Sequence, residues 1–393
     1  MKKPLFFLSF SFLIMIVLVF TYARNQIRKN RFETRAIKLS MEQRLNSNTK
    51  SLAFHVKDPF LQLPFSLSTV RFAEDDGIVL GVKTISIRNV VAPYNASLTA
   101  RGDDLLLFFR YDQFSNDCPL PFKARIGCVK LDENLDQTDE EYKEIRLENE
   151  FNEDPRAFFI NNELYLSYNS IRKNRPSNSS ARIIKLAHLD ASTLDVLEEV
   201  SLDIKRQNIE KNWTPFAVTN GLKEDLFFKY YLSKNQNLLL EDFKLAHLSE
   251  VIHAHPRFPT NGGWAIQWGE LRGGTPALKI SDEEYLSFFH SSFSCVDGTF
   301  WYIMGAYTFE TKRPFRITKV SHYPLLFKGI FTAPLLNTAN PNIRCVFPAG
   351  FVIKKRNGKD VIYLSIGEND SCVKILTLDK EALLGSLKKI HFD

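Results

Sequence analysis

A unit of about 60 residues recurs five times along this sequence, and it limits the possible folds more than any other feature. Each copy has a short polar motif, an apolar strand, a turn of charged or Asn and Gly residues, and a second apolar strand. The copies begin at Asn95, Asp154, Asn212, Gly274 and Phe347. Repeats of this length are typical of four-stranded blades arranged radially around a channel. The sequence therefore predicts an all-β fold, a five-bladed β-propeller, with a β-sandwich as the alternative.

The amino-terminal end differs from the repeats. Residues 4–23 contain no charged side chain, and a helix of that length spans the roughly 30 Å hydrocarbon layer of a bilayer. A cleaved signal peptide is the alternative, although its apolar region is usually shorter. We expect a single-pass transmembrane helix as a membrane anchor in residues 1–30, a stem in residues 31–65 and a catalytic propeller in residues 66–393. Basic residues flank the apolar segment on both sides, so the side of the membrane stays open.

The net charge of +6 comes from the anchor region and not from the repeats. Six of the 51 basic residues, and no acidic residue, lie in residues 1–31, which leaves 45 basic against 45 acidic residues in the rest of the chain. A neutral body lacks the positive surface of a nucleic-acid-binding protein, so we expect no nucleic-acid partner. The five cysteines form no CxxC pair, and we expect no metal site and no cofactor.

The inner strand of a propeller blade begins near the central channel, so the repeat starts should converge on one funnel. The residues expected there are Asn95, Glu153, Asp154, Arg156, Lys211, Asn212, Trp213, Gly274, Thr275 and Pro348. Asp154 is the strongest catalytic candidate, because a carboxyl group beside a second carboxylate can act as a general acid in a cleft. The alternative is a turn-capping role for Asp154 before Pro155.

Further polar side chains stand at strand ends or motif starts. They are Arg110, Arg182, Lys211 and His290. A cluster of cations in a neutral protein would suit a phosphate group or a nucleotide sugar. Each could instead be a solvated charge, and His290 could be a satisfied core histidine. Trp213 could stack on a sugar ring or lie buried within its blade.

Six motifs, in order, resemble those of the β-1,2-mannoside phosphorylases and their hydrolase and mannosyltransferase relatives. The motifs are Glu153–Arg156, Lys211–Phe216, Gly273–Pro276, Phe288–His290, Tyr302–Ala306 and Val346–Gly350. The resemblance covers about residues 90–380. It implies a five-bladed propeller without a metal, anomeric inversion in the phosphorylases and hydrolases, and Asp154 as the general acid.

The resemblance also implies roles by motif position. Arg110, Arg182 and Lys211 match basic residues that hold phosphate, and His290 matches a family histidine. A second histidine of the phosphorylases is replaced near Tyr230 and Tyr231, which argues against phosphorolysis. Glu310 falls where the family often has an acidic residue.

Three classes of function stay open at this point. The favoured one is mannosyl transfer to a mannose-containing glycan, with phosphate or a sugar-phosphate or nucleotide-sugar donor as the second partner, because an anchor and a missing histidine suit a transferase better than a phosphorylase. An inverting hydrolase would need a second carboxylate as base, for which Glu310, Glu368 and Asp370 are candidates. A non-catalytic glycan-binding propeller is the third class.

Overall fold

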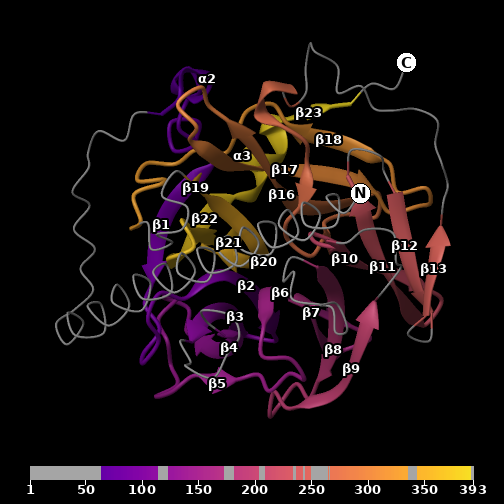
Figure 1. Ribbon diagram of the computed structural model, residues 1–393. Helices are drawn as coiled ribbons and strands as arrows, with labels where there is room; N and C mark the ends of the chain where they lie inside the picture. Colours follow the sequence, from indigo (N-terminus) through magenta and orange to yellow (C-terminus); the bar gives the residue numbers. More distant parts are fainter. Residues whose placement is uncertain are drawn as a thin grey trace, which may run out of the picture.

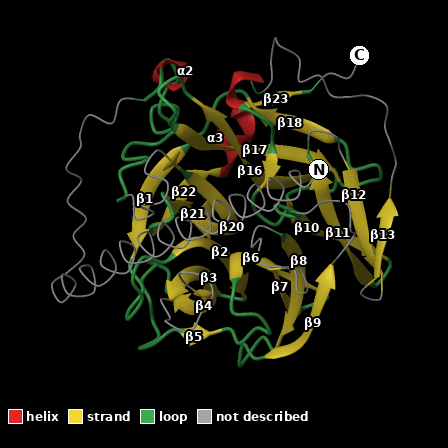
Figure 2. Ribbon diagram, viewed as in Figure 1, coloured by secondary structure: helices red, strands yellow, loops and turns green. Residues whose placement is uncertain are grey.

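The computed structural model describes residues 63–113, 123–171, 181–202, 209–232, 236–241, 244–248, 264, 266–334 and 343–390. Strands dominate this part of the chain, as Figure 2 shows. The short helical elements are α2 (Phe65–Ser68), η1 (Ile266–Trp268) and α3 (Lys380–Ser386). None of the helices in the described part is long and apolar enough to cross a membrane. The predicted anchor and nearly all of the predicted stem lie outside the described residues.

The strands of the described residues form five sheets, and four of these are four-stranded blades. Three blades are built from strands that follow one another in the sequence, each paired with the next. Their bounds are β2 (Tyr94–Arg101), β3 (Asp104–Gln113), β4 (Lys123–Leu131), β5 (Lys143–Glu144); β6 (Asn152–Ile160), β7 (Glu163–Ile171), β8 (Arg182–Leu189), β9 (Val196–Leu202); β10 (Thr214–Asn220), β11 (Lys223–Tyr231), β12 (Gln236–Glu241) and β13 (Lys244–Leu248). The first three repeats therefore form the blades that the sequence predicts.

The fourth repeat forms a larger sheet of seven strands. They are β14 (Arg272–Gly273), β15 (Leu278–Lys279), β16 (Glu284–Ser294), β17 (Phe300–Glu310), β18 (Ile317–Ser321), β19 (Ile343–Arg344) and β23 (Leu387–Lys389). Its inner edge is broken into β14 and β15, which both pair with β16 on either side of Pro276, a residue without an N–H to donate. The all-β, propeller-like fold is thus confirmed. The described residues contain four regular four-stranded blades, whereas the repeat predicts five similar ones.

The last blade joins the two ends of the described chain. Its strands β20 (Val346–Arg356), β21 (Lys359–Glu368) and β22 (Cys372–Asp379) come from the carboxy-terminal part, and β1 (Val79–Ile85) comes from the amino-terminal part. Strand β1 pairs antiparallel with β22, and the two lie side by side in Figure 1. This pairing closes the ring of sheets and removes two exposed edges.

The core lies between neighbouring sheets. Phe108 of β3 and Leu166 of β7 belong to one buried cluster, and Phe158 of β6 and Phe228 of β11 belong to the next. Apolar side chains therefore face the adjacent sheets, and the starts of the inner strands are left for polar groups. In Figure 1 the inner strands β2, β6, β10 and β20 surround the centre of the molecule.

The polar residue that begins each of the first three repeats has a left-handed backbone. The φ angle is 46° at Asn95, 54° at Asp154 and 64° at Asn212. Asn and Asp adopt this conformation more readily than other non-glycine residues. A bulge interrupts the pairing of β6 with β7 between Glu153 and Arg156, and a bulge re-aims the side chain that it contains. The repeated Asn or Asp in the sequence therefore reflects a backbone requirement beside the channel.

Strand β2 of the first blade closely approaches β20 and β21 of the last blade. A Cβ atom on Gly367 would lie 2.1 Å from Oδ1 of Asn95, and one on Gly350 would lie 2.4 Å from the backbone nitrogen of Leu98. The hydroxyl of Ser365 also accepts a hydrogen bond of 3.0 Å from the Leu98 nitrogen. Only glycine allows such an approach of a backbone to its neighbour. These contacts hold Asn95 at the channel.

Candidate active site

Asp154 is fixed by hydrogen bonds from two amide side chains. Its Oδ1 accepts from Nδ2 of Asn95 at 2.9 Å, and its Oδ2 accepts from Nδ2 of Asn169 at 3.0 Å. A guanidinium nitrogen of Arg110 lies 3.7 Å from Oδ1. The residue is only 6% exposed. Both carboxyl oxygens are therefore oriented by the first two blades without any substrate present, which is the kind of support that catalytic groups need.

Asn169 was not predicted from the sequence. It lies in β7 directly opposite Glu153, between Tyr168 and Ser170, and it is fully buried. A buried amide in a strand needs polar partners, and this is the one signal that could have identified it. Among the described residues, no group donates to Oδ1 of Asn169 or of Asn95. Both acceptor oxygens are buried, and that of Asn95 lies against Gly367.

Glu153 gathers the predicted cations around one carboxylate. Its Oε1 lies 3.2 Å from Nη1 of Arg110, and its Oε2 lies 3.1 Å from Nε of Arg182 and 2.8 Å from Nζ of Lys211. Burial alone would raise the pKa of Glu153, but the charges of Arg110, Lys211 and Arg182 outweigh it and hold that pKa well below its usual value. The structure brings these three cations together and pairs all of them with Glu153.

Arg110 also takes part in a second group of polar residues that the sequence did not point to. Its guanidinium lies 4.7 Å from the ring centre of Tyr94, and its Nε lies 3.3 Å from Oδ1 of Asp112. The Tyr94 hydroxyl donates to Oδ2 of Asp112 at 2.8 Å. Burial raises the pKa of Asp112, although Arg110 and the Tyr94 hydrogen bond oppose it. These contacts fix the Arg110 side chain between two carboxylates of β3 and β6.

Arg156 and Thr275 have structural partners. The Arg156 guanidinium is 1% exposed and donates to the carbonyl oxygens of Gly274 at 2.5 Å and Gly273 at 3.3 Å, and to Oδ1 of Asn212 at 3.4 Å. Burial lowers the pKa of Arg156 to about 10. Thr275 is fully buried, and its hydroxyl accepts from the Phe288 nitrogen. Arg156 and Asn212 therefore connect the second and third blades to the seven-stranded sheet.

His290 lies inside the protein beside Phe347, with ring centres 4.7 Å apart. It is 2% exposed, and its Nδ1 has no hydrogen-bond partner in the described part of the chain. Burial lowers the pKa of His290 well below its usual value, and the charges of Arg156, Arg272 and Lys211 lower it further. The imidazole is therefore neutral at physiological pH and lies within the electrostatic field of these cations.

Two predicted site residues, Trp213 and Glu310, lie away from the polar cluster around Asp154. Trp213 is 1% exposed and packs edge-on against Phe228 and Tyr230. It therefore belongs to the core of its blade and does not form a sugar-stacking surface. Glu310 ends β17, at the opposite end of that strand from Phe300, and lines a groove with Arg313 and Lys389. Glu310, which the sequence offered as a candidate base, therefore lies in this groove and not in the polar cluster around Asp154.

Glu368 also fails as a candidate base. It is fully buried, its Oε1 accepts from the Ala333 nitrogen at 2.7 Å, and its Oε2 forms an ion pair of 2.8 Å with Lys374. A base must have a lone pair that substrate or water can reach. The adjacent turn contains Asp370, which is partly exposed.

Asp370 has an environment that favours its protonated form. Burial raises its pKa from 3.8 to about 6, and the charges of Asp154, Asp112 and Glu153 raise it while Arg110 opposes the shift. Its φ angle of 49° is left-handed, as is that of Asn369 before it. The turn between β21 and β22 therefore holds Asp370 in a conformation that costs free energy for a non-glycine residue, a feature that is common at functional sites.

This raised pKa predicts a pH-dependent stability. Between about pH 4 and pH 6 the folded state binds the Asp370 proton more tightly than the unfolded state, so its contribution to stability is lost as the pH rises through that range. Replacing Asp370 by asparagine should therefore stabilise the protein more at pH 7 than at pH 4.5. Urea unfolding of both proteins at the two pH values measures this, and equal differences at the two values would contradict the assignment.

The described residues contain no group of three or more His, Cys, Asp or Glu side chains arranged to hold a metal ion. The candidate site is thus an assembly of carboxylates, amides and cations. Its centre is Asp154, with Asn95 and Asn169 on its two oxygens and the Glu153 cation cluster beside it.

No protein-family model and no curated protein matches this chain. Solved structures do match. One is a mannose phosphorylase from Leishmania mexicana in complex with a phosphate ion, with a TM-score of 0.52, 16% identity, and coverage of 81% of this chain and 95% of that one. Another is β-1,2-mannobiose phosphorylase from Listeria innocua with bound β-1,2-mannobiose, with a TM-score of 0.52, 13% identity, and coverage of 80% and 98%.

A third structure represents glycoside hydrolases of the mannoside phosphorylase family that target β-1,2 mannosidic linkages in Candida mannan. Its TM-score is 0.51 at 13% identity, with coverage of 76% of this chain and 86% of that one. At such identities the likeness establishes the fold alone. The fold is one that glycan-active enzymes use, and these neighbours belong to the same family that the sequence motifs resemble.

Proposed function

We propose that this chain is a mannoside-active enzyme that transfers a mannosyl group, with Asp154 as its general acid or base. The observation that carries the proposal is the Asp154 carboxyl group, which two amides orient at 2.9 and 3.0 Å beside a cluster of three cations. The structural neighbours named for phosphorylase and hydrolase activity on mannosides support the substrate class. A carboxyl group held in this way is positioned to move a proton at a reacting oxygen.

Proton transfer and charge stabilisation would be divided between two groups of residues. Asp154 would take the proton of the attacking hydroxyl, or give one to a leaving sugar oxygen in the reverse direction. Lys211 and Arg182 would stabilise the negative charge of a phosphate on the mannosyl donor. Asn95 and Asn169 would keep the Asp154 carboxyl group oriented for this proton transfer through their amide hydrogen bonds.

Two observations favour transfer over phosphorolysis. The cations that would hold free phosphate are paired with Glu153, so inorganic phosphate would compete with an internal carboxylate. Tyr230 and Tyr231 stand where the phosphorylases that the motifs resemble have a histidine. A donor whose phosphate is held by the rest of a larger molecule would compete better than a free ion.

Inverting hydrolysis is the second candidate, and Asp370 is the observation that favours it. A carboxyl group with a pKa of about 6 is largely ionised near pH 7 and basic enough to activate water. In inverting hydrolases the two carboxyl groups stand roughly 6.5–9.5 Å apart to admit that water. The Asp370→Asn variant would then lose hydrolysis, whereas a transferase would keep its transfer activity.

Product analysis tests the proposed function. The protein is incubated with β-mannosides with and without phosphate, and separately with mannose 1-phosphate or nucleotide-mannose and a mannoside acceptor. Transfer from a phosphate-linked donor is the expected result. Efficient hydrolysis of mannosides, with no transfer from either donor, would overturn the proposal in favour of the hydrolase.

The Lys211→Ala variant should weaken donor use much more than acceptor use. Loss of a hydrogen bond to a charged group corresponds to roughly a 10- to 100-fold rise in donor KM, because the ammonium would contact the donor phosphate. Steady-state kinetics with each substrate varied in turn measure the split. Lys312→Ala, which removes an exposed cation from the groove beside Glu310, is the matched control and should behave as wild type. Equal effects on donor and acceptor would contradict the assigned role.

We also propose that the seven-stranded sheet, which the fourth repeat forms, serves as one of five blades. A separate proposal is that residues 4–23 anchor the protein in a membrane. The β14 and β15 pieces stand where the fourth repeat begins, which supports the first statement. The uncharged stretch supports the second. Carbonate extraction of membranes from cells that express the full chain tests the anchor, since a soluble protein would be released.

A further inference from the structure

Arg110 is held by carboxylates from two blades. Its Nε lies 3.3 Å from Oδ1 of Asp112, and its Nη1 lies 3.2 Å from Oε1 of Glu153 and 3.7 Å from Oδ1 of Asp154. Alternate residues of a strand point to the same face of its sheet, which places Asp112 beside Arg110 in β3. The guanidinium thus connects a carboxylate of its own strand with the carboxylate of the proposed general acid or base.

Tyr94 contacts both members of the pair in β3. Its ring centre lies 4.7 Å from the guanidinium carbon of Arg110, and its hydroxyl donates to Oδ2 of Asp112 at 2.8 Å. Burial raises the pKa of Tyr94 well above its usual value, so the hydroxyl keeps its proton at physiological pH and stays a donor. Asp112 therefore has both carboxyl oxygens engaged, Oδ1 by Arg110 and Oδ2 by Tyr94. A carboxylate engaged in this way fixes the position of its partners.

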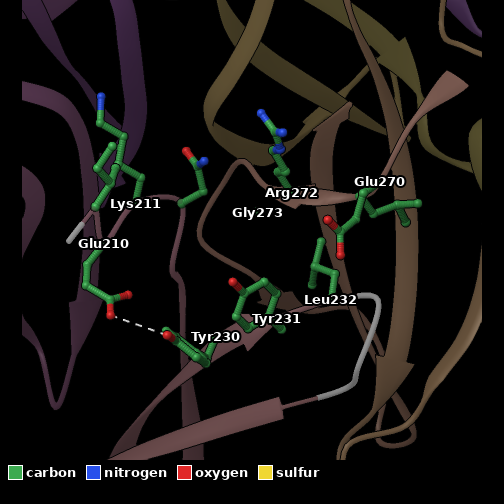
Figure 3. Close-up of a pocket in the computed structure, with 11 residues that line it drawn as sticks. Glu210, Lys211, Tyr230, Tyr231, Leu232, Glu270, Arg272 and Gly273 are labelled. Carbon is green, nitrogen blue, oxygen red and sulfur yellow. Dashed lines mark hydrogen bonds between the residues drawn. The ribbon is translucent and has the colours of Figure 1, made fainter. Parts of the chain in front are cut away.

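Lys211 is more accessible than Arg110. Its side chain is 32% exposed, whereas that of Arg110 is 10% exposed. Figure 3 shows Lys211 at a cavity of about 350 Å³ that Arg272 also lines, with the nitrogens of both side chains directed to one side. Arg110 is not among the described residues that line this cavity. A ligand in the cavity would therefore meet Lys211, while Arg110 keeps its internal carboxylate partners.

We propose that Asp112 is a positioning residue of the active site, which holds Arg110 against Asp154. Arg110 in turn orients the carboxyl group that moves the proton and does not bind the donor phosphate. The inference rests on the proposed function, in which Asp154 is the general acid or base. It departs from the phosphate-binding role that the family resemblance implies for Arg110. A displacement of about 1 Å can cost a reaction about 100-fold, so the residue that fixes Arg110 affects turnover.

Asp112→Asn tests the proposal, because it removes the charge that pairs with Arg110 and keeps the shape of the side chain. Its kcat should fall about 10- to 100-fold, the size of one hydrogen bond to a charged group, while the donor KM stays as in wild type. Tyr94→Phe keeps the ring beside Arg110 and removes only the hydroxyl, so it should lower kcat by a smaller factor and also leave the donor KM unchanged. Steady-state kinetics of the full-length protein measure both parameters, and thermal unfolding checks the fold.

The matched control is Asp104→Asn, at the opposite end of β3, where the carboxylate pairs with Arg101 at 3.2 Å and is half exposed. It should keep the wild-type kcat and KM. Combining Asp112→Asn with Asp154→Asn should cost no more than Asp154→Asn alone, because Asp112 acts through Asp154. A rise in donor KM at unchanged kcat would return Arg110 to the phosphate site and overturn the proposal. A further loss of turnover in the double variant would overturn it as well.

Failure of this inference differs from failure of the proposed function. If Asp154→Asn is inactive and Asp112→Asn turns over as wild type, only the positioning role is overturned. If Asp154→Asn keeps wild-type turnover, the proposed function is overturned together with this inference. Hydrolysis without transfer would overturn the proposed transfer, and the same variants would then test Asp112 in hydrolysis. If Asp112→Asn does not fold, Tyr94→Phe decides by the same criteria.

Discussion

Replacing Asp154 by asparagine should lower the turnover of mannosides by about 10²–10⁴-fold while the fold stays intact. An amide has nearly the shape of a carboxyl group but does not exchange a proton at a reacting oxygen. The new amide would face the N–H donors of Asn95 and Asn169, which now serve the two carboxyl oxygens. Either neighbour can rotate its own amide by half a turn, because its Oδ1 has no donor among the described residues. Steady-state kinetics and a thermal unfolding curve measure the two effects.

The matched control is Asp282→Asn, which changes a carboxylate that is fully exposed at the turn before β16. It should retain wild-type turnover and stability. Asp154→Ala provides a second comparison, because it leaves both amides without an acceptor in a buried place and should also lower stability. A turnover of Asp154→Asn within a few-fold of wild type would remove Asp154 from the mechanism, whatever the other variants do.

The propeller-like architecture could be predicted because each repeat has a recognisable local sequence pattern. An Asn or Asp with a left-handed backbone begins each of the first three blades, and alternating apolar strands follow it. The prediction of five similar blades was wrong for the fourth repeat, which belongs to the seven-stranded sheet. Gly273 and Gly274 allow a close approach to Asn212 and to Phe288, Pro276 interrupts the inner strand, and distant segments join the sheet. Pairing of segments far apart in the sequence leaves no local pattern to read.

The candidate site was predictable where residues lie at repeat starts. Glu153, Asp154 and Lys211 fall there, and they meet as expected. Asn169 and Asp112 were missed because they lie late in the second strand of a blade, where the register, unknown from sequence, decides which residue faces Asp154. Glu368 was wrongly considered for the opposite reason, since its carboxylate points to Lys374 inside the blade.

That buried pair leads to the largest expected effect on stability. Replacing Lys374 by methionine should destabilise the protein by about 3–5 kcal/mol, because the Glu368 carboxylate would remain buried without its cation. Glu368 is fully buried and lies 2.8 Å from the Lys374 ammonium, which also donates to the Gly329 oxygen at 2.9 Å. Methionine keeps the apolar stem and removes only the charge and its hydrogen bonds. Urea unfolding followed by tryptophan fluorescence measures the loss.

A second lysine, at the start of helix α3 directly after this blade, provides the comparison. Lys380 pairs with Asp360 at 2.8 Å, but the Asp360 side chain is 37% exposed, and exposed pairs are worth at most about 1 kcal/mol. Lys380→Met should therefore cost much less than Lys374→Met. Adding Glu368→Gln to Lys374→Met should recover part of the loss, since the uncompensated charge is then gone. Equal costs for the two lysine variants, or no recovery in the double variant, would mean that the Glu368 charge is compensated by other groups. Recovery would instead show that the cost of Lys374→Met comes from the unpaired charge of Glu368, as expected for a structural ion pair of the last blade.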